Sequence, residues 1–319
     1  MKALTELDAD ALAALFRSLD EPKYRAEQVR KWVYQRGALS FDAMTDLPKR
    51  LREGLAKEWA VASSRVAAVS EAKDGTRKLL IAFADGECVE AVPIPDGERL
   101  TLCVSTQVGC PIRCVFCASG LGGVKRNLEA HEIVEQVLHA TNDVAAHRER
   151  GKLVARPERV GVPAHGPAAS RGVAAHLDPG KASLLGGEKR TIGNLVFMGM
   201  GEPLANYDAL VASLRVLSAP WGAGIGTNRI TVSTVGLLDK MERFAEEPVA
   251  TNLAVSLHAS NDEVRARVIP LLKDVGVDAL IAGAVKYRRM TGKDVTFEYV
   301  LLDGVNSGED HARELAARV

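Results

Sequence analysis

The chain has 319 residues, of which 47% are hydrophobic and 26% charged, and its formal net charge is +0. This is the composition of an ordinary globular protein that can bury a sizeable core. No run approaches the roughly 18 to 20 apolar residues of a membrane-spanning helix, and the acidic start MKALTELDAD is unlike a signal peptide. We therefore expect a cytoplasmic protein with no membrane partner. The balanced charge leaves any nucleic-acid binding to local basic patches.

The first sixty residues predict a small helical unit. Apolar side chains recur at helical spacing over residues 8–19, behind an aspartate that can cap the helix. A second helix is expected over 25–36. A third is expected to begin near Asp46 with Pro48 in its first turn.

Basic and aromatic side chains interleave in this unit, and they have two interpretations. Such side chains can hold phosphates and stack on bases, which predicts an RNA-binding surface. Alternatively, the aromatic side chains belong to the core of an amphipathic helix and the charges are simply solvated, which the spacing alone favours. The residues concerned are Lys23, Tyr24, Arg25, Arg30, Lys31, Trp32, Tyr34, Arg36, Lys49, Arg50 and Arg52.

Residues 66–94 change to a period of two and predict a β-hairpin that turns at Asp85 and Gly86. Its second strand carries Cys88 and Glu90, which share one face because they are two residues apart. An acid on a strand is usually just solvated, and Cys88 is interpreted as a small packing residue.

Strands and helices alternate through the rest of the chain. This alternation predicts an α/β fold with a parallel sheet, either a barrel or an open wound sheet, whose site lies at the carboxyl ends of the strands. Strands are expected at 193–199, 229–233, 252–257 and 295–301, and helices at 131–147, 207–218, 236–246, 261–268 and 277–290.

Three cysteines, Cys110, Cys114 and Cys117, form a CxxxCxxC triplet in a loop rich in Gly and Pro. Soft thiolates select zinc, copper(I) or iron–sulfur clusters. Three close thiolates suit a cluster with one open iron, whereas structural zinc normally has four ligands. Cys103 could be a fourth ligand, or a disulfide could form, and the spacing alone leaves these alternatives open. With Phe116 the spacing resembles the signature of the radical S-adenosylmethionine (SAM) superfamily, in which the open iron chelates SAM.

Polar motifs follow the predicted strands at the edge where SAM would bind. They are GMGEP at 199–203, STVG at 233–236, SLHAS at 256–260, and Asn306. Each motif singly is an ordinary strand end. Together they offer Glu202 to an ammonium group, and Gly201 allows the backbone to approach a ligand closely.

The strings LCVSTQVGCPIRCVFCASG, RNL, GMGEPLAN, STVG, SLHA and YVLLDGVN together resemble the RlmN family over nearly the whole chain. The resemblance implies a partial (βα)6-type radical SAM barrel at 99–319, with a helical RNA-binding unit at 1–62 and a β-hairpin linker at 63–98. It also implies methylation of C2 of adenine in 23S ribosomal RNA (rRNA), at the peptidyl transferase centre, and in transfer RNA (tRNA), next to the anticodon.

Residue roles follow from the same resemblance. Cys110, Cys114 and Cys117 would bind a 4Fe-4S cluster. Glu90 would abstract the C2 proton, and Cys103 would form a disulfide at product release. The residues that would hold SAM are Gly201, Glu202, Ser233, Ser256, Leu257, His258 and Asn306.

The chemistry explains why such a family needs radicals. C2 of adenine is electron-poor and cannot attack the methyl group of SAM, so the resemblance implies a methyl-cysteine intermediate and a 5′-deoxyadenosyl radical. We expect a monomer that receives electrons from an external donor such as a flavodoxin-like protein. The alternatives are a Cfr-type adenine C8 methyltransferase, a radical SAM enzyme with a small-molecule substrate, or an RNA-binding relative without methyl transfer.

The sequence departs from the family pattern in two places. No cysteine follows Cys117, although the family carries the methyl group on a cysteine near its C-terminus, and the chain stops within a helical pattern at Val319. The chain is therefore expected to be either C-terminally truncated, which the end within a helical pattern favours, or a divergent member that lacks the methyl carrier. In either case we expect this chain to bind a cluster without completing methyl transfer. The second departure is an aperiodic stretch at 147–190, interpreted as a flexible insertion; His165 and His176 in it have no recognisable ligand partners.

Overall fold

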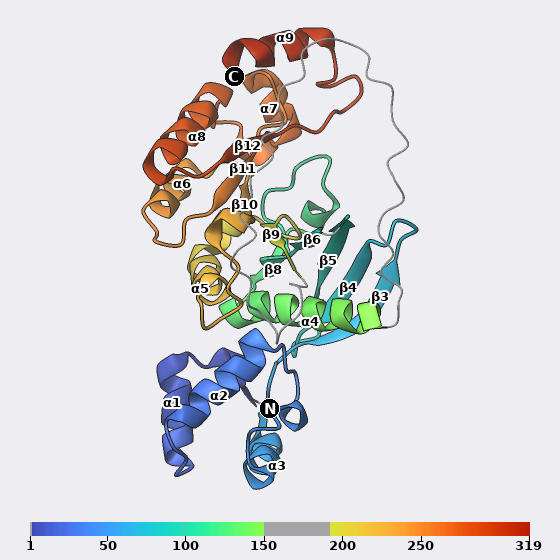
Figure 1. The fold of residues 1–319 in the computed structure, drawn as a ribbon. Coiled ribbons are helices and arrows are strands. Elements are labelled where there is room, and N and C mark those ends of the chain that lie inside the picture. Colours follow the sequence, from blue (N-terminus) through green and yellow to red (C-terminus); the bar gives the residue numbers. More distant parts are fainter. Residues whose placement is uncertain (1, 98, 150–191) are drawn as a thin grey trace.

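An eight-stranded mixed sheet forms the centre of the computed structural model, which describes residues 2–97, 99–149 and 192–319 (Figure 1). The strands β12, β11, β10, β9 and β6 pair in parallel, and β5, β4 and β3 continue the sheet in antiparallel pairing. In order across the sheet they span Val295–Glu298 (β12), Asn252–Ser256 (β11), Ile230–Thr234 (β10), Asn194–Phe197 (β9), Arg99–Cys103 (β6), Cys88–Asp96 (β5), Arg77–Ala82 (β4) and Arg65–Glu71 (β3).

The two faces of the sheet differ in what covers them. One face carries fully buried apolar side chains such as Leu102, Leu195 and Val232, which share a core with the flanking helices. The register places Cys103, Ser233 and Ser256 on the opposite face, where exposure is greater. The helices that follow the strands are α4 (Ala130–Glu149), α5 (Tyr207–Ser218), α6 (Leu238–Ala245), α7 (Asp262–Val268), α8 (Val277–Thr291) and α9 (Glu309–Arg318).

The predicted alternation of strands and helices agrees with this arrangement, with boundaries that differ by a few residues. The helix expected over 207–218 has those bounds, whereas the strand expected over 295–301 ends at Glu298. Within the described residues β12 and β3 are the edge strands of the sheet. The α/β fold with a partial barrel is confirmed.

The N-terminal helices gather on the far side of α4 from the sheet (Figure 1). Helix α1 (Ala9–Ser18) is capped by Asp8, whose carboxylate accepts the Ala11 N–H at 2.7 Å. Helix α2 (Tyr24–Arg30) continues into a π-helical turn at Lys31–Gln35. Two short strands, β1 (Lys2–Ala3) and β2 (Trp59–Ala60), pair in parallel and close the unit.

The third helix begins later than the sequence predicted. Helix α3 spans Lys49–Glu58, and Pro48 is its N-cap residue rather than a member of its first turn. Pro48 has an extended ψ of 138°, so helical geometry starts only at the next residue. The residues before it form a 3₁₀ turn at Phe41–Ala43.

The hairpin is continuous with the barrel strands. Val92 in β5 pairs with Cys103 in β6, so the sheet crosses the boundary that we expected between a linker at 63–98 and a barrel at 99–319. The division into three parts stays a prediction. Helix α4 extends to Glu149, which moves the start of the predicted insertion, and residues 150–191 lie outside the described part of the chain.

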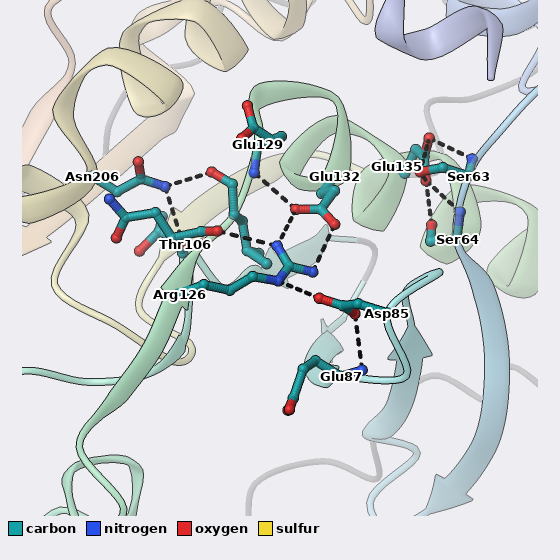
Figure 2. A network of polar contacts seen from close by, with 12 residues as sticks. Ser63, Ser64, Asp85, Glu87, Thr106, Arg126, Glu129, Glu132, Glu135 and Asn206 are labelled. Carbon is teal, nitrogen blue, oxygen red and sulfur yellow. Dashed lines mark hydrogen bonds and ion pairs between the residues drawn. The ribbon is translucent and has the colours of Figure 1, made fainter. Parts of the chain in front are cut away.

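A buried carboxylate on α4 holds the N-terminal unit to the barrel (Figure 2). Glu135 is fully buried and accepts the Thr5 hydroxyl at 2.5 Å and the backbone N–H groups of Ser63 and Ser64 at 2.8 Å each. Both serine hydroxyls also donate to it. A single side chain therefore satisfies donors from both ends of the N-terminal unit.

We predict that Glu135→Gln lowers the free energy of unfolding by about 2–3 kcal/mol, because the new amide nitrogen faces donors and leaves at least one of them unpaired. Urea unfolding measures this change. The exposed pair of Glu242 with Lys286 provides the control, since Glu242→Gln removes a carboxylate from solvent. Equal stability of the two variants would contradict the prediction.

Candidate active site at the open face of the sheet

The cysteine loop is closed at its base by a two-stranded antiparallel ribbon. Strands β7 (Gln107–Gly109) and β8 (Val124–Asn127) flank it, and the Cys110 N–H donates to the Gly123 carbonyl at 3.1 Å. Gly109 has φ +82°, and a Cβ there would lie 2.0 Å from the Gly123 oxygen. The close approach of the two strands therefore requires glycine at this position.

The three loop thiols lie close enough to influence one another. Burial raises the pKa of Cys114 to about 12, and repulsion from Cys110 and Cys117 adds to the shift. Within the described ranges, no three His, Cys, Asp or Glu side chains are placed to hold one metal ion. In an iron–sulfur cluster each thiolate binds a different iron, so the sulfur atoms lie farther apart than around one ion. The donor set itself, three thiolates on one loop, suits a cluster with one open iron, since structural zinc normally takes four ligands.

The loop packs against the end of the sheet through apolar and aromatic contacts. Ile112 belongs to a small buried cluster with Val235 and Val268, against which Cys110 and Cys114 also pack. The Val115 N–H donates to the Val268 carbonyl on α7 at 3.1 Å. Next to it, the ring of Phe116 meets the ring of His258 edge to face, with centroids 4.8 Å apart. These contacts fix the thiols above the strand ends.

Glu202, in the loop that follows β9, carries a buried carboxylate at the strand ends on which the cysteine loop packs. Its side chain is 3% exposed and accepts the N–H groups of Leu204 at 3.1 Å and Val235 at 2.9 Å. Burial raises its pKa to about 7, and no ion pair joins it to a Lys or Arg of the residues that the structure describes. A buried acid without a cation fits the ammonium group of SAM.

Gln107, which the sequence analysis did not single out, positions the loop that carries Glu202. Its amide oxygen accepts the Glu202 N–H at 2.8 Å, and its nitrogen donates to Asn127 at 2.7 Å. Gly201 has φ +110°, and a Cβ there would lie 2.8 Å from the Gln107 side chain. Packing against Gln107 therefore already requires glycine at position 201, whether or not a ligand approaches the backbone there. The only sequence signal for Gln107 was its place beside the cysteine loop.

The serines and histidine of the next two strand ends lie beside this loop. The Ser233 hydroxyl donates to the Phe197 carbonyl at 2.7 Å, and Leu257 is fully buried. His258 Nδ1 accepts the Val300 N–H at 3.1 Å, and burial lowers the pKa of its imidazole to about 4. The ring is therefore neutral with its proton on Nε2.

Asn306 organises the loop around His258 with its side-chain amide. The amide nitrogen donates to the carbonyls of His258 at 2.8 Å and Val300 at 2.7 Å, and the oxygen accepts the Leu302 N–H at 2.6 Å. These bonds occupy the polar atoms that were expected to reach SAM. In this structure Asn306 acts on the site through His258.

Glu90 and Cys103 lie on the open face, on adjacent strands. Val92 pairs with Cys103, and Glu90 is two residues from Val92 on the same face. Burial raises the pKa of Cys103 to about 11, so its thiol is protonated at neutral pH. The Glu90 carboxylate is 44% exposed and pairs with Lys78 at 2.8 Å, a partner that the sequence did not reveal.

Arg126 connects the cysteine loop to the hairpin and to α4 (Figure 2). Its Nε donates to Asp85 in the hairpin turn at 2.5 Å, and its two terminal nitrogens bind Glu132 at 2.7 and 2.9 Å. The pairing also lowers the pKa of the Asp85 carboxyl, because the bond to Arg126 favours its charged form. The turn of the hairpin that carries Glu90 is thereby tied to the strand that leaves the cysteine loop.

Of the three aromatic residues singled out in the N-terminal unit, Trp32 and Tyr34 pack against the core, whereas Tyr24 is 51% exposed. The guanidinium of Arg30 lies 4.0 Å from the ring centre of Trp221, and that of Arg36 lies 4.1 Å from Trp32. The Trp32 indole N–H also donates to Asp46. The basic residues of this set that are exposed are Lys23, Lys31, Arg36, Lys49 and Arg50.

Comparisons with known proteins show which family the chain belongs to. Residues 2–61 match the ribosomal RNA large subunit methyltransferase N-terminal domain, and residues 182–316 match the radical SAM superfamily. The probable dual-specificity RNA methyltransferase RlmN of Rhodopirellula baltica is 39% identical over 307 residues, 96% of this chain and 71% of the relative. The dual-specificity RNA methyltransferase RlmN of Halorhodospira halophila is 41% identical over 317 residues, 99% of this chain and 76% of the relative. The chain belongs to the RlmN family.

A solved structure supports the same relationship. The crystal structure of a radical SAM methyltransferase from Sphaerobacter thermophilus matches with a TM-score of 0.81 and 38% identity, over 99% of this chain and 81% of that one. The family assignment made from the motifs is confirmed. Membership of the radical SAM superfamily implies a 4Fe-4S cluster and SAM. None of the helices in the described ranges is long and apolar enough to cross a membrane.

We predict that Gly109→Ala impairs cluster binding, since the added Cβ forces β7 away from β8 at a cost of about 1–3 kcal/mol in a strained backbone. Iron and sulfide per chain after anaerobic reconstitution measure the effect. Gly122→Ala in the same loop is the matched control, because a Cβ there meets nothing within 4 Å. Equal iron content in both variants would refute the requirement.

We also predict a pH-dependent effect of Glu202→Gln on the chain without cofactors. The folded-state pKa of about 7 exceeds the ordinary value of 4.5, so ionisation of Glu202 destabilises the fold as pH rises between them. Glutamine does not ionise, so the variant does not lose this part of its folding free energy as pH rises. The free energy of unfolding of the variant relative to the parent should thus increase by roughly 3 kcal/mol from pH 5 to pH 8. Glu298→Gln, at an exposed position, should show no such trend in urea unfolding.

Proposed function

We propose that this protein is a radical SAM methyltransferase that methylates C2 of adenine in 23S rRNA and in tRNA. The observation that supports the proposal is the register that puts Glu90 and Cys103 on the same open face of the sheet, on which Ser233 and Ser256, two of the proposed SAM-binding residues, also lie. Cleavage of SAM alone requires neither a carboxylate nor a thiol there. The names of the relatives, dual-specificity RNA methyltransferases, support the same activity.

Each group at the site has a role that its chemistry supports. A 4Fe-4S cluster bound by Cys110, Cys114 and Cys117 would supply the radical chemistry together with SAM. Glu202 would bind the ammonium group of SAM. The neutral His258 ring would hold the segment after β12 in place, because its Nδ1 accepts the Val300 N–H. The other SAM-binding residues proposed at this edge are Gly201, Ser233, Ser256 and Leu257, and Asn306 would support them by holding the His258 loop.

Glu90 would take the proton from the adenine ring when the substrate is bound. Its carboxylate is exposed enough to meet a base that enters the open face, and Lys78 stabilises the negative charge. Cys103 is protonated and mostly buried one strand away. At product release this thiol would attack the sulfur of the methyl-carrying cysteine, so that a disulfide forms as the bond from that sulfur to the methylene carbon breaks and the carbon takes up a proton.

Methylation at C8 of the same adenine, as in a Cfr-type enzyme, is the second candidate. The motifs that form the SAM edge do not distinguish the two, because both reactions begin at the same cofactors. The proposed substrates are rRNA and tRNA, with an external, flavodoxin-like electron donor, and we propose that the protein works as a cytoplasmic monomer.

The test uses the protein expressed from its natural gene, reconstituted anaerobically and supplied with SAM, a reductant and RNA fragments that contain the target adenine. We expect 5′-deoxyadenosine and, after digestion of the RNA, 2-methyladenosine by mass spectrometry. Glu90→Gln should abolish the methylated product while SAM cleavage persists. A product of 8-methyladenosine would favour the second candidate, and an absence of both products with active SAM cleavage would favour a small-molecule substrate.

RNA binding by the N-terminal unit predicts a particular salt dependence. Replacing Lys31 and Arg50 by Ala should weaken RNA binding and reduce the slope of log affinity against log salt by about 1 for each phosphate that is no longer neutralised. Arg30 is unsuitable for this test because it packs on Trp221. Arg289→Ala on α8 is an exposed control, and a shared slope in all variants would leave the unit without a role in RNA binding.

A further inference from the structure

Arg265 on α7 is the largest of the fully buried side chains in the described residues. Its guanidinium donates to the carbonyls of Ser256 at 2.9 Å and Leu257 at 2.6 Å, at the end of β11. It also donates to the Val235 carbonyl at 2.6 Å, at the end of β10. One side chain thus connects the two strand ends that carry the STVG and SLHA motifs.

Among the described residues, no carboxylate lies within ion-pair distance of the Arg265 guanidinium, and the exposed Asp262 on the same helix adds electrostatic attraction only from farther away. The buried Nε of Arg265 has no hydrogen-bond partner in the part of the chain that the structure describes. Three carbonyl dipoles offset only part of the cost of burying a cation. A fold that keeps such a charge calls for negative charge nearby.

The cysteine loop is the neighbour that can supply it. Cys114 packs on the apolar cluster formed by Val235 and by Val264 and Val268, which flank Arg265 on α7. The residue after it, Val115, is hydrogen-bonded to the Val268 carbonyl.

We propose that Arg265 is a positioning residue that stabilises the reduced cluster with its buried charge and locks the two SAM-binding strand ends together. The inference rests on the proposed binding of a 4Fe-4S cluster by the three cysteines. A cluster held by three thiolates is negatively charged, and it becomes more negative when it accepts an electron. A fixed positive charge in a low-dielectric setting therefore favours the reduced state.

This role has two separable parts. The charge acts on the reduction potential of the cluster, and the planar fork of the guanidinium acts on the geometry of the carbonyls that it binds. Lysine keeps the charge but cannot bind three carbonyls in the same fork. Glutamine keeps an amide donor for a carbonyl but has no charge.

The experiment measures the midpoint potential of the cluster by redox titration followed by electron paramagnetic resonance, without SAM or RNA. Arg265→Gln should retain iron and sulfide and shift the potential to more negative values, whereas Arg265→Lys should stay close to the parent. SAM binding, followed by equilibrium dialysis, should weaken in both variants. Arg267→Gln is the matched control, since Arg267 is an exposed arginine on the same helix.

The outcomes separate the two proposals. An Arg265→Gln variant with a full cluster and the parent potential would overturn the inference and leave the proposed function intact. Loss of the cluster in Arg265→Gln but not in Arg265→Lys would support a requirement for the charge, whereas equal loss in both would show a structural role only and overturn it. Failure of the parent protein to bind any cluster would overturn the proposed function itself.

Discussion

The pairing of β5 with β6 is the contact on which the site depends. It joins an antiparallel hairpin to a parallel sheet in a register that places Val92 beside Cys103, and the alternation of side chains then sends Glu90 to the same face. A shift of one residue would turn that carboxylate into the helix-covered core. The parallel strands assemble one end of the candidate active site, and this single register adds the Glu90 carboxylate and the Cys103 thiol to it.

Helix α4 holds the remaining parts in relation to the sheet. Glu132 and Glu135, three residues apart, lie on the same side of the helix and bind different partners. The first reaches Arg126 and thereby the hairpin turn, and the second reaches the linker that follows the N-terminal helices. Helix α4 therefore anchors both the N-terminal unit and the hairpin.

The sequence predicted the parts that depend on period and on motif. Strand and helix alternation, the hairpin turn and the convergence of GMGEP, STVG and SLHA at one edge followed from spacing alone. The sequence could not reveal which distant side chains pair with buried or charged groups, because residues far apart in the chain form such pairs without any local pattern. Gln107, Lys78 and Arg265 became visible only through their partners. Pro48 shows the limit at a boundary, where one residue of extended backbone shifts the start of a helix.

Val235 is held from two sides by charges of opposite sign. Its N–H binds the buried carboxylate of Glu202, and its carbonyl binds the buried guanidinium of Arg265. Backbone held in this way is already ordered in the folded protein, so a ligand that binds there causes little further loss of conformational entropy. The strand end where SAM is proposed to bind is thus rigid before the cofactor enters, and affinity can come from contacts rather than from ordering a loop.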